Sequence, residues 1–155
     1  LQEAEEQGFV TLKHTIRLLQ EMNEPYPHAI AKDGDKVVGY ALVMLKEFSQ
    51  QIPKLDPMFA QIEQASFQNE KLNSYKYFIM GQVCVDKAYR GKRIFDNLYL
   101  TLKAQMKPHF DFVLTEVATR NVRSMKAHQR VGFESVQLYN SPSGEEWEII
   151  VWDWK

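Results

Sequence analysis

A short basic turn is the part of this sequence best suited to binding a charged ligand. It lies between a continuous apolar segment, Tyr77–Val85, and a segment with helical spacing, and its basic residues are Lys87, Arg90, Lys92 and Arg93. A helix N-terminus presents unpaired backbone N–H groups and the positive end of the helix dipole, so a turn of this kind can hold a phosphate. The alternative is a basic turn that is only solvated.

A second group of polar side chains follows further along the chain. Asn121, Ser124 and His128 are spaced i, i+3 and i+7, which places them on one face of a helix. The pKa of histidine is ordinarily about 6.5, so His128 can donate a proton if its ring is held partly charged. The alternative is a histidine on the surface of the helix.

Two reactive side chains lie inside apolar segments. Glu116 shares a strand face with Phe112 and Leu114, and it is either a proton acceptor with a perturbed pKa or a carboxylate that points to solvent. Cys84 could accept an acyl group, or it is inert packing within a strand. As the only cysteine, it excludes an internal disulfide framework and a multi-cysteine zinc site, and we expect no metal.

The elements around these residues alternate between strand and helix. Strands over 77–85 and 110–117 flank a helix over 93–107, a βαβ unit that should be parallel and right-handed. A helix over 123–131 follows, with Gly132 as its C-cap.

Antiparallel hairpins are predicted at both margins of this unit. One pairs 28–30 with 37–45, and the other pairs 133–139 with 147–154. Residues 9–23 precede them with helical spacing, although 9–14 could also be extended. The long connection 46–76 contains a short helix from Asp56-Pro57 to about residue 65. The predicted fold class is α/β: a mixed sheet with a parallel centre, antiparallel hairpins at its margins and helices on both faces.

Composition limits the classes of protein that this chain can represent. Its 155 residues predict one domain over 1–155, and a net charge of −1 gives no general attraction to nucleic acid or to membranes. The longest apolar run has nine residues, whereas a bilayer span needs about 20. The acidic first residues do not resemble a signal peptide. We therefore expect a cytoplasmic protein without nucleic-acid or membrane partners.

The basic turn resembles the acetyl-CoA-binding motif of the GNAT superfamily of N-acetyltransferases. That motif is Arg/Gln, two residues, Gly, one residue and Gly/Ala, after a strand of the form Val-x-Val. Val83-Cys84-Val85 and the segment 90–95 fall in this register. Arg93 occupies the position of the first signature glycine, and Phe95 that of Gly/Ala.

The segment 121–133 resembles the second signature of the same family, an asparagine, a helix that carries a tyrosine, and a closing Gly-Phe. Asn121 and Gly132-Phe133 are in register, while His128 stands at the tyrosine position. The order of elements after residue 77 also matches the family. The resemblance implies that the family's first strand lies at or before Leu1.

The resemblance implies a role for each of these residues. The backbone of the strand would bond the pantetheine arm, the turn would hold the pyrophosphate, Asn121 and Ser124 would face the cofactor, and His128 would protonate the departing thiolate. Glu116 is the candidate general base. The cofactor-binding residues implied are Val83, Cys84, Val85, Arg90, Gly91, Lys92, Arg93, Ile94, Phe95, Asn121 and Ser124.

The function implied is the direct transfer of an acetyl group from acetyl-CoA, as co-substrate, to a primary amine of a small molecule or peptide. The segment 46–76 is expected to cover the acceptor side of the site, and a homodimer is possible. The alternative is a regulatory module that binds CoA without transferase activity, because Arg93, Phe95 and His128 depart from the family pattern.

Overall fold

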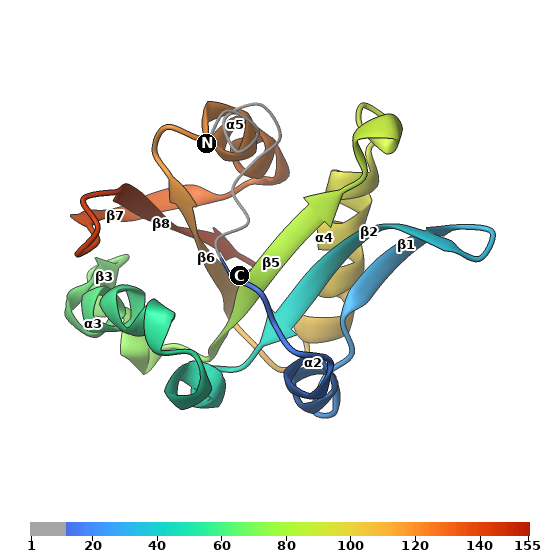
Figure 1. Ribbon diagram of the computed structural model, residues 1–155. Helices are drawn as coiled ribbons and strands as arrows, with labels where there is room; N and C mark the ends of the chain where they lie inside the picture. Colours follow the sequence, from blue (N-terminus) through green and yellow to red (C-terminus); the bar gives the residue numbers. More distant parts are fainter. Residues whose placement is uncertain (1–11) are drawn as a thin grey trace.

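A six-stranded sheet with strand order β1-β2-β5-β6-β8-β7 is the frame of the computed structural model, which describes residues 12–155 (Figure 1). Within it, β5 and β6 run parallel, and the other neighbouring strands are antiparallel. This confirms the predicted mixed sheet with a parallel centre. The strands are β1 (Ala29–Asp33), β2 (Lys36–Met44), β5 (Tyr77–Val85), β6 (Phe112–Ala118), β7 (Glu134–Asn140) and β8 (Glu146–Asp153).

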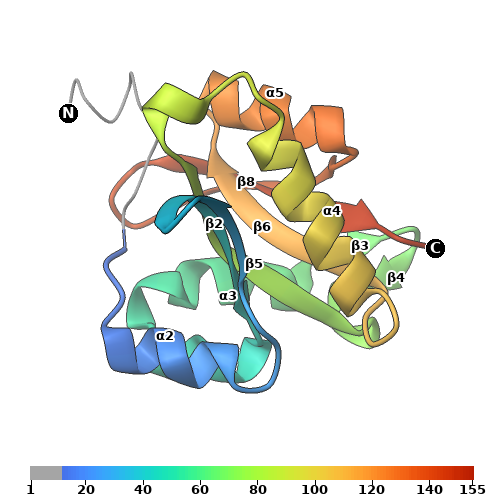
Figure 2. The same ribbon diagram turned by 90° about the vertical axis from the view of Figure 1, so that its right-hand side faces the viewer.

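Helices cover both faces of the sheet, as the sequence predicts (Figure 2). Apolar side chains of α4 (Ile94–Met106) pack into one core cluster beside α5 (Val122–Val131). Those of α2 (Ile16–Asn23) and α3 (Asp56–Gln64) pack into a second cluster on the opposite face. Among residues 12–155, none of the helices has the length and apolar composition that a bilayer crossing requires.

The connection between β2 and β5 is largely ordered into short elements rather than an open loop. Its predicted helix is confirmed as α3, although Leu55, not Asp56, is the N-cap and makes no side-chain cap bond. Two 3-10 helices, Lys46–Gln51 and Pro53–Leu55, precede α3. A small hairpin of β3 (Ser66–Phe67) and β4 (Glu70–Lys71) and a third 3-10 helix, Leu72–Ser74, follow it.

The first described helix begins later than the sequence pattern suggests. The side chain of Thr15 accepts a hydrogen bond from the backbone N–H of Leu18, which caps α2 and starts it at Ile16 rather than at residue 9. Residues 9–11, and the strand expected at or before Leu1, lie outside the described residues. At the centre, β6 begins at Phe112, two residues after the predicted start.

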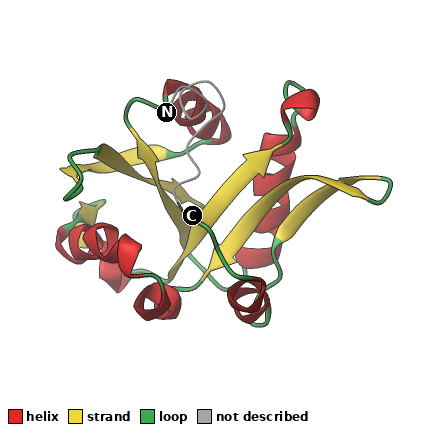
Figure 3. Cartoon of the chain, viewed as in Figure 1, coloured by secondary structure: helices red, strands yellow, loops and turns green. Residues whose placement is uncertain are grey.

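The two parallel strands separate after only three paired residues. β5 and β6 pair at Tyr77–Phe112, Phe78–Val113 and Ile79–Leu114 and not beyond. The register of β5 on β2 also shifts at Gly81, a bulge that bends β5 away from β6. The strands diverge toward their carboxyl ends (Figure 3), which is where α/β sheets bind ligands.

A substitution of Gly132, the C-cap of α5, tests how tightly that helix packs on the sheet. Its φ is +124°, and a Cβ there would lie 2.9 Å from Nε1 of Trp152. Gly132→Ala should therefore lower the free energy of unfolding by about 2–4 kcal/mol. Gly144→Ala is the control, because its φ is +86° with no atom within 4 Å, so backbone strain alone should cost about 1 kcal/mol. Urea denaturation measures both; equal losses would show that contact with Trp152 is unimportant.

Candidate functional site

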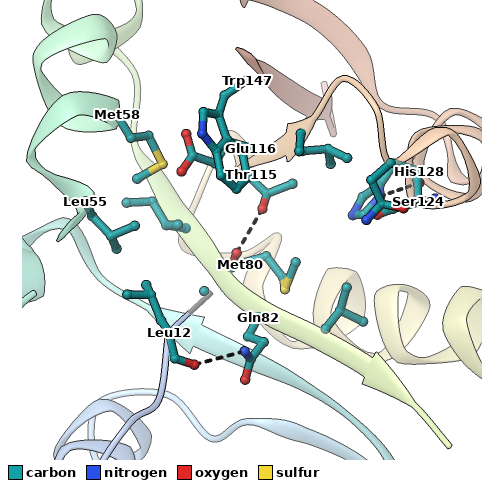
Figure 4. Close-up of a pocket in the computed structure, with 16 residues that line it drawn as sticks. Leu12, Leu55, Met58, Met80, Gln82, Thr115, Glu116, Ser124, His128 and Trp147 are labelled. Carbon is teal, nitrogen blue, oxygen red and sulfur yellow. Dashed lines mark hydrogen bonds between the residues drawn. The ribbon is translucent and has the colours of Figure 1, made fainter. Parts of the chain in front are cut away.

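The separation of β5 and β6 opens a cleft of about 110 Å³, shown in Figure 4. Its walls come from both strands, from α5, from β8 and from the segment between β2 and β5. Five of the predicted site residues line it together: Val83, Glu116, Asn121, Ser124 and His128. The tertiary structure thus joins residues that are up to 45 positions apart in the sequence.

The remaining predicted residues lie along β5 and the turn after it, outside the lining of this cleft. Cys84 and Val85 end β5, and the segment 90–95 leads into α4. Cys84 is half-buried and pairs in register with Tyr40 on β2, an arrangement consistent with packing. Among the described residues, no three His, Cys, Asp or Glu side chains are grouped so that they could hold a metal ion.

Glu116 is a largely buried carboxylate in the cleft. Burial raises its pKa to about 7, although a hydrogen bond from the hydroxyl of Tyr139 partly opposes that shift. The Tyr139 pKa is itself raised, first by burial and then by the neighbouring carboxylate. A carboxylate with a pKa near neutrality can accept a proton from a substrate at physiological pH.

Two cleft-side aromatic residues were not among the predicted site residues. Trp147 lines the cleft from β8, and Tyr139 on β7 reaches Glu116 across β8. Strand alternation predicts which face each side chain occupies. It does not show that β8 lies between β6 and β7, so the sequence carries no signal for the contact between Tyr139 and Glu116.

His128 is buried, with only 1% of its surface exposed, and both ring nitrogens are occupied. Nδ1 donates to the backbone carbonyl of Ser124 at 2.8 Å, which leaves Nε2 to accept from the hydroxyl of Tyr99 at 2.7 Å. Burial lowers the pKa of His128 to about 4. The predicted acid role requires a partly charged ring, so this geometry favours a structural role for His128 instead.

Two departures from the family pattern contact each other. The ring of Phe95 packs edge-on against His128, with centroids 5.0 Å apart, and it also contacts Tyr99 at 5.1 Å. His128 in turn packs against Phe133. Phe95 therefore has a packing role, within an aromatic cluster between α4, α5 and the sheet.

The turn before α4 has the backbone shape that a glycine would favour. Arg93 caps α4 with φ +59° and ψ +20°, in the left-handed region, and Gly91 has φ +80°. A non-glycine residue pays about 1 kcal/mol or more for this conformation. The resemblance had aligned Arg93 with a signature glycine, and the backbone at this position matches that alignment.

The same turn is tied to the β1–β2 hairpin. The side chain of Asp86 accepts from the backbone N–H of Ala88 at 2.9 Å and pairs with Lys36 at 3.2 Å. The hydroxyl of Tyr89 donates to Asp33 at 2.7 Å. These contacts hold the turn against the sheet, so its backbone N–H groups are positioned before any ligand binds.

Basic side chains from two helix starts gather near this turn. The pKa of Arg123 is lowered, first by burial and then by the charge of Arg90. Two further arginines, one before α5 and one on it, have acidic partners: Arg120 pairs with Glu145 at 2.6 Å, and Arg130 with Asp96 at 2.7 Å.

Comparisons with known proteins agree with this arrangement. The sequence matches a family model described as "Acetyltransferase (GNAT) family" over residues 2–133. No curated protein sequence gives a match.

Solved structures share the fold at low sequence identity. The NatC complex bound to Gag peptide and CoA is 13% identical, with a TM-score of 0.66 over 94% of this chain and 84% of that one. The ribosomal-protein-S18-alanine N-acetyltransferase of Escherichia coli is 12% identical, with a TM-score of 0.57 over 92% of this chain and 79% of that one. Naa20 of Chaetomium thermophilum, in complex with a bisubstrate analogue, is 15% identical, with a TM-score of 0.62 over 92% of this chain and 75% of that one. The predicted fold class is confirmed.

Glu116 and His128 should give opposite pH dependences of stability. The His128 pKa falls from 6.5 to about 4 on folding, so only the unfolded chain gains a proton as the pH drops through this range, and stability falls. The Glu116 pKa rises from 4.5 to about 7, so stability is lost as the pH rises from 4.5 to 7. Each effect reaches up to about 3 kcal/mol, and in the wild type they largely cancel.

Single variants should expose each effect in urea denaturation between pH 4 and 7.5. Glu116→Gln should gain stability relative to the wild type as the pH rises, and His128→Gln should gain stability relative to the wild type as the pH falls below 6.5. The comparison uses the slope of the free energy of unfolding against pH rather than its absolute value, since both substitutions also alter packing. A His128→Gln slope equal to that of the wild type would mean that His128 titrates normally.

Arg93 should strain the turn through its backbone and not through its charge. Arg93→Gly should raise the free energy of unfolding by up to about 1 kcal/mol, because glycine adopts a positive φ without a steric penalty. Arg93→Ala removes the same charge but keeps the strain, and it should show no such gain. Thermal denaturation of both variants measures this difference. A glycine variant no more stable than the alanine variant would show that the backbone at Arg93 is not strained.

Proposed function

The chain belongs to the acetyltransferase (GNAT) family and is an acetyltransferase, and from this premise we propose that it transfers the acetyl group of acetyl-CoA directly to a primary amine. The observation that carries this proposal is the cleft between β5 and β6, which contains the half-buried carboxylate of Glu116 and one edge of β5 without a paired strand. A direct transfer needs no acyl-enzyme, in keeping with the absence of Cys84 from the cleft lining.

The cofactor side of the site consists of backbone as much as side chains. Beyond Ile79, the edge of β5 that faces β6 has no strand pairing, so Val83, Cys84 and Val85 can bond an extended pantetheine arm as an added strand. A backbone N–H of this edge would also polarise the thioester carbonyl, a contribution typically worth about 3 kcal/mol.

The phosphate side of the same cofactor would be held by the turn and the start of α4. The backbone N–H groups over 90–95 lie at a helix N-terminus, and the guanidinium groups of Arg90 and Arg123 add positive charge. Asn121 and Ser124 reach the cleft from α5. When bound, acetyl-CoA supplies an activated acetyl thioester at the cleft.

Glu116 would act as the general base. An amine attacks only when neutral, and a desolvated site lowers the pKa of an ammonium group while it raises that of a carboxyl group, so proton transfer to Glu116 becomes easier. The C–N bond forms as the C–S bond breaks, and the thiolate takes its proton from water, because His128 is held neutral. Tyr139 would position the carboxylate of Glu116 through its hydrogen bond.

Titration of Glu116 should set the acid limb of the pH–rate profile. The rate should rise with pH to a plateau above about 7, since the base works only when ionised. Tyr139→Phe should move this limb to higher pH, because the lost hydrogen bond had favoured the charged carboxylate. Glu116→Gln should lower kcat about 10²- to 10⁴-fold and leave the increase in Tm caused by acetyl-CoA unchanged.

The measurement is CoA release with a panel of amines, together with Tm at millimolar acetyl-CoA. No increase in Tm would contradict acetyl-CoA binding. An increase without CoA release from any amine would favour a domain that binds CoA without transferring acetyl groups. A Tyr139→Phe profile that superimposes on the wild type would show that Tyr139 does not act on the base.

A further inference from the structure

We infer that the acceptor is a primary amine on an apolar, otherwise uncharged carbon skeleton, that is, an alkylamine or arylalkylamine. The inference rests on the proposed function and adds the chemical class of the acceptor. Three features of the cleft carry it: an apolar wall around a single carboxylate, the lack of any basic group to pair an acid, and polar neighbours that already have partners.

The wall of the cleft around Glu116 is apolar. Leu12, Leu55 and Met58 lie opposite Trp147, and the Glu116 carboxylate lies between them, while Ser124 and His128 occupy the other end (Figure 4). Leu55 and Met58 come from the segment 46–76, which lines the cleft through these two side chains. An ammonium group can pair with the carboxylate while its carbon skeleton packs on these side chains.

Within residues 12–155, the cleft lining offers no Lys or Arg side chain to receive an acid next to the amine. Among the described residues that line it, Glu116 is the only charged one. Lys13 and Lys54 line a neighbouring hollow that shares only Leu12 with the cleft. An α-carboxylate on the acceptor would thus be desolvated beside Glu116 without a counter-charge.

The polar side chains beside the wall already have hydrogen-bond partners within the protein. Gln82 accepts from the hydroxyl of Tyr40 at 3.0 Å and donates to the carbonyl of Leu12 at 3.4 Å. Thr115 donates to the carbonyl of Met80 at 3.0 Å. An amide next to the acceptor amine would therefore find few side-chain partners here, which penalises a peptide N-terminus relative to a simple amine.

Matched acceptors test the inference with the wild-type chain and acetyl-CoA. Phenethylamine, phenylalaninamide and phenylalanine share a ring and differ only in the group beside the amine. With kcat/KM corrected for the fraction of neutral amine, phenethylamine should exceed phenylalaninamide at least tenfold and phenylalanine at least a hundredfold. Hexylamine should exceed butylamine, by about fourfold for each extra methylene that is buried.

Variants of the wall should change this preference in defined directions. Met58→Lys should lower the rate with phenethylamine and raise the rate with phenylalanine, because it supplies the missing cation; Met58→Leu is the matched control and should keep the wild-type order. Trp147→Ala, at a half-buried position, should reduce the ratio of phenethylamine to butylamine. This second variant keeps the test valid if Met58→Lys fails to fold.

The outcomes separate this inference from the proposed function. Efficient acetylation of polyamines, peptides or 6-aminohexanoate in preference to hexylamine would overturn the acceptor class and leave the transferase function intact. If no amine is acetylated although acetyl-CoA raises Tm, the transfer proposal fails instead. Calorimetric titration of the CoA-bound protein still decides the acceptor class, and phenethylamine binding no tighter than phenylalanine would contradict it.

Discussion

The early end of pairing between β5 and β6 is the constraint on which the rest of the site depends. Three residue pairs join these strands, and the bulge at Gly81 then turns β5 away. Because β5 continues beyond this point, one row of its backbone N–H and C=O groups has no neighbouring strand. In a closed sheet those groups would be satisfied, whereas here they form one side of a cleft, and the side chains of β6 form the other.

Burial acts in opposite directions on the pKa values of Glu116 and His128, which lie at different ends of the cleft. Burial disfavours the charged form of any group, so it raises the pKa of Glu116 and lowers that of His128. The carboxyl group is thereby brought to a pKa where it can exchange protons near neutrality, while the imidazole is removed from that range. One physical cause thus moves the two pKa values in opposite directions.

The departures from the family motif form a connected set and not a series of isolated losses. Phe95 fills space against His128, and His128 bonds both Tyr99 and the backbone of α5. A phenylalanine where the motif has a small residue is accommodated because the side chain opposite is an imidazole within the same aromatic cluster. Arg93 differs: its backbone keeps the left-handed conformation of the glycine that it replaces.

The sequence by itself determined the order of elements, the parallel centre and the positions of the turn and of the α5 cap. These follow from local periodicity, from Gly132, and from motif spacing, which concern neighbours within a few residues of each other. It also placed Glu116 on the correct strand face.

Only the tertiary structure decided which groups surround those side chains. Periodicity states that His128 shares a face with Ser124, but whether that face meets a ligand or Tyr99 depends on how α5 packs against α4. Likewise, the contact between Tyr139 and Glu116 exists because β8 lies between their strands. Burial, and with it each pKa, arises from all the segments that pack around a group, so no local pattern can encode it.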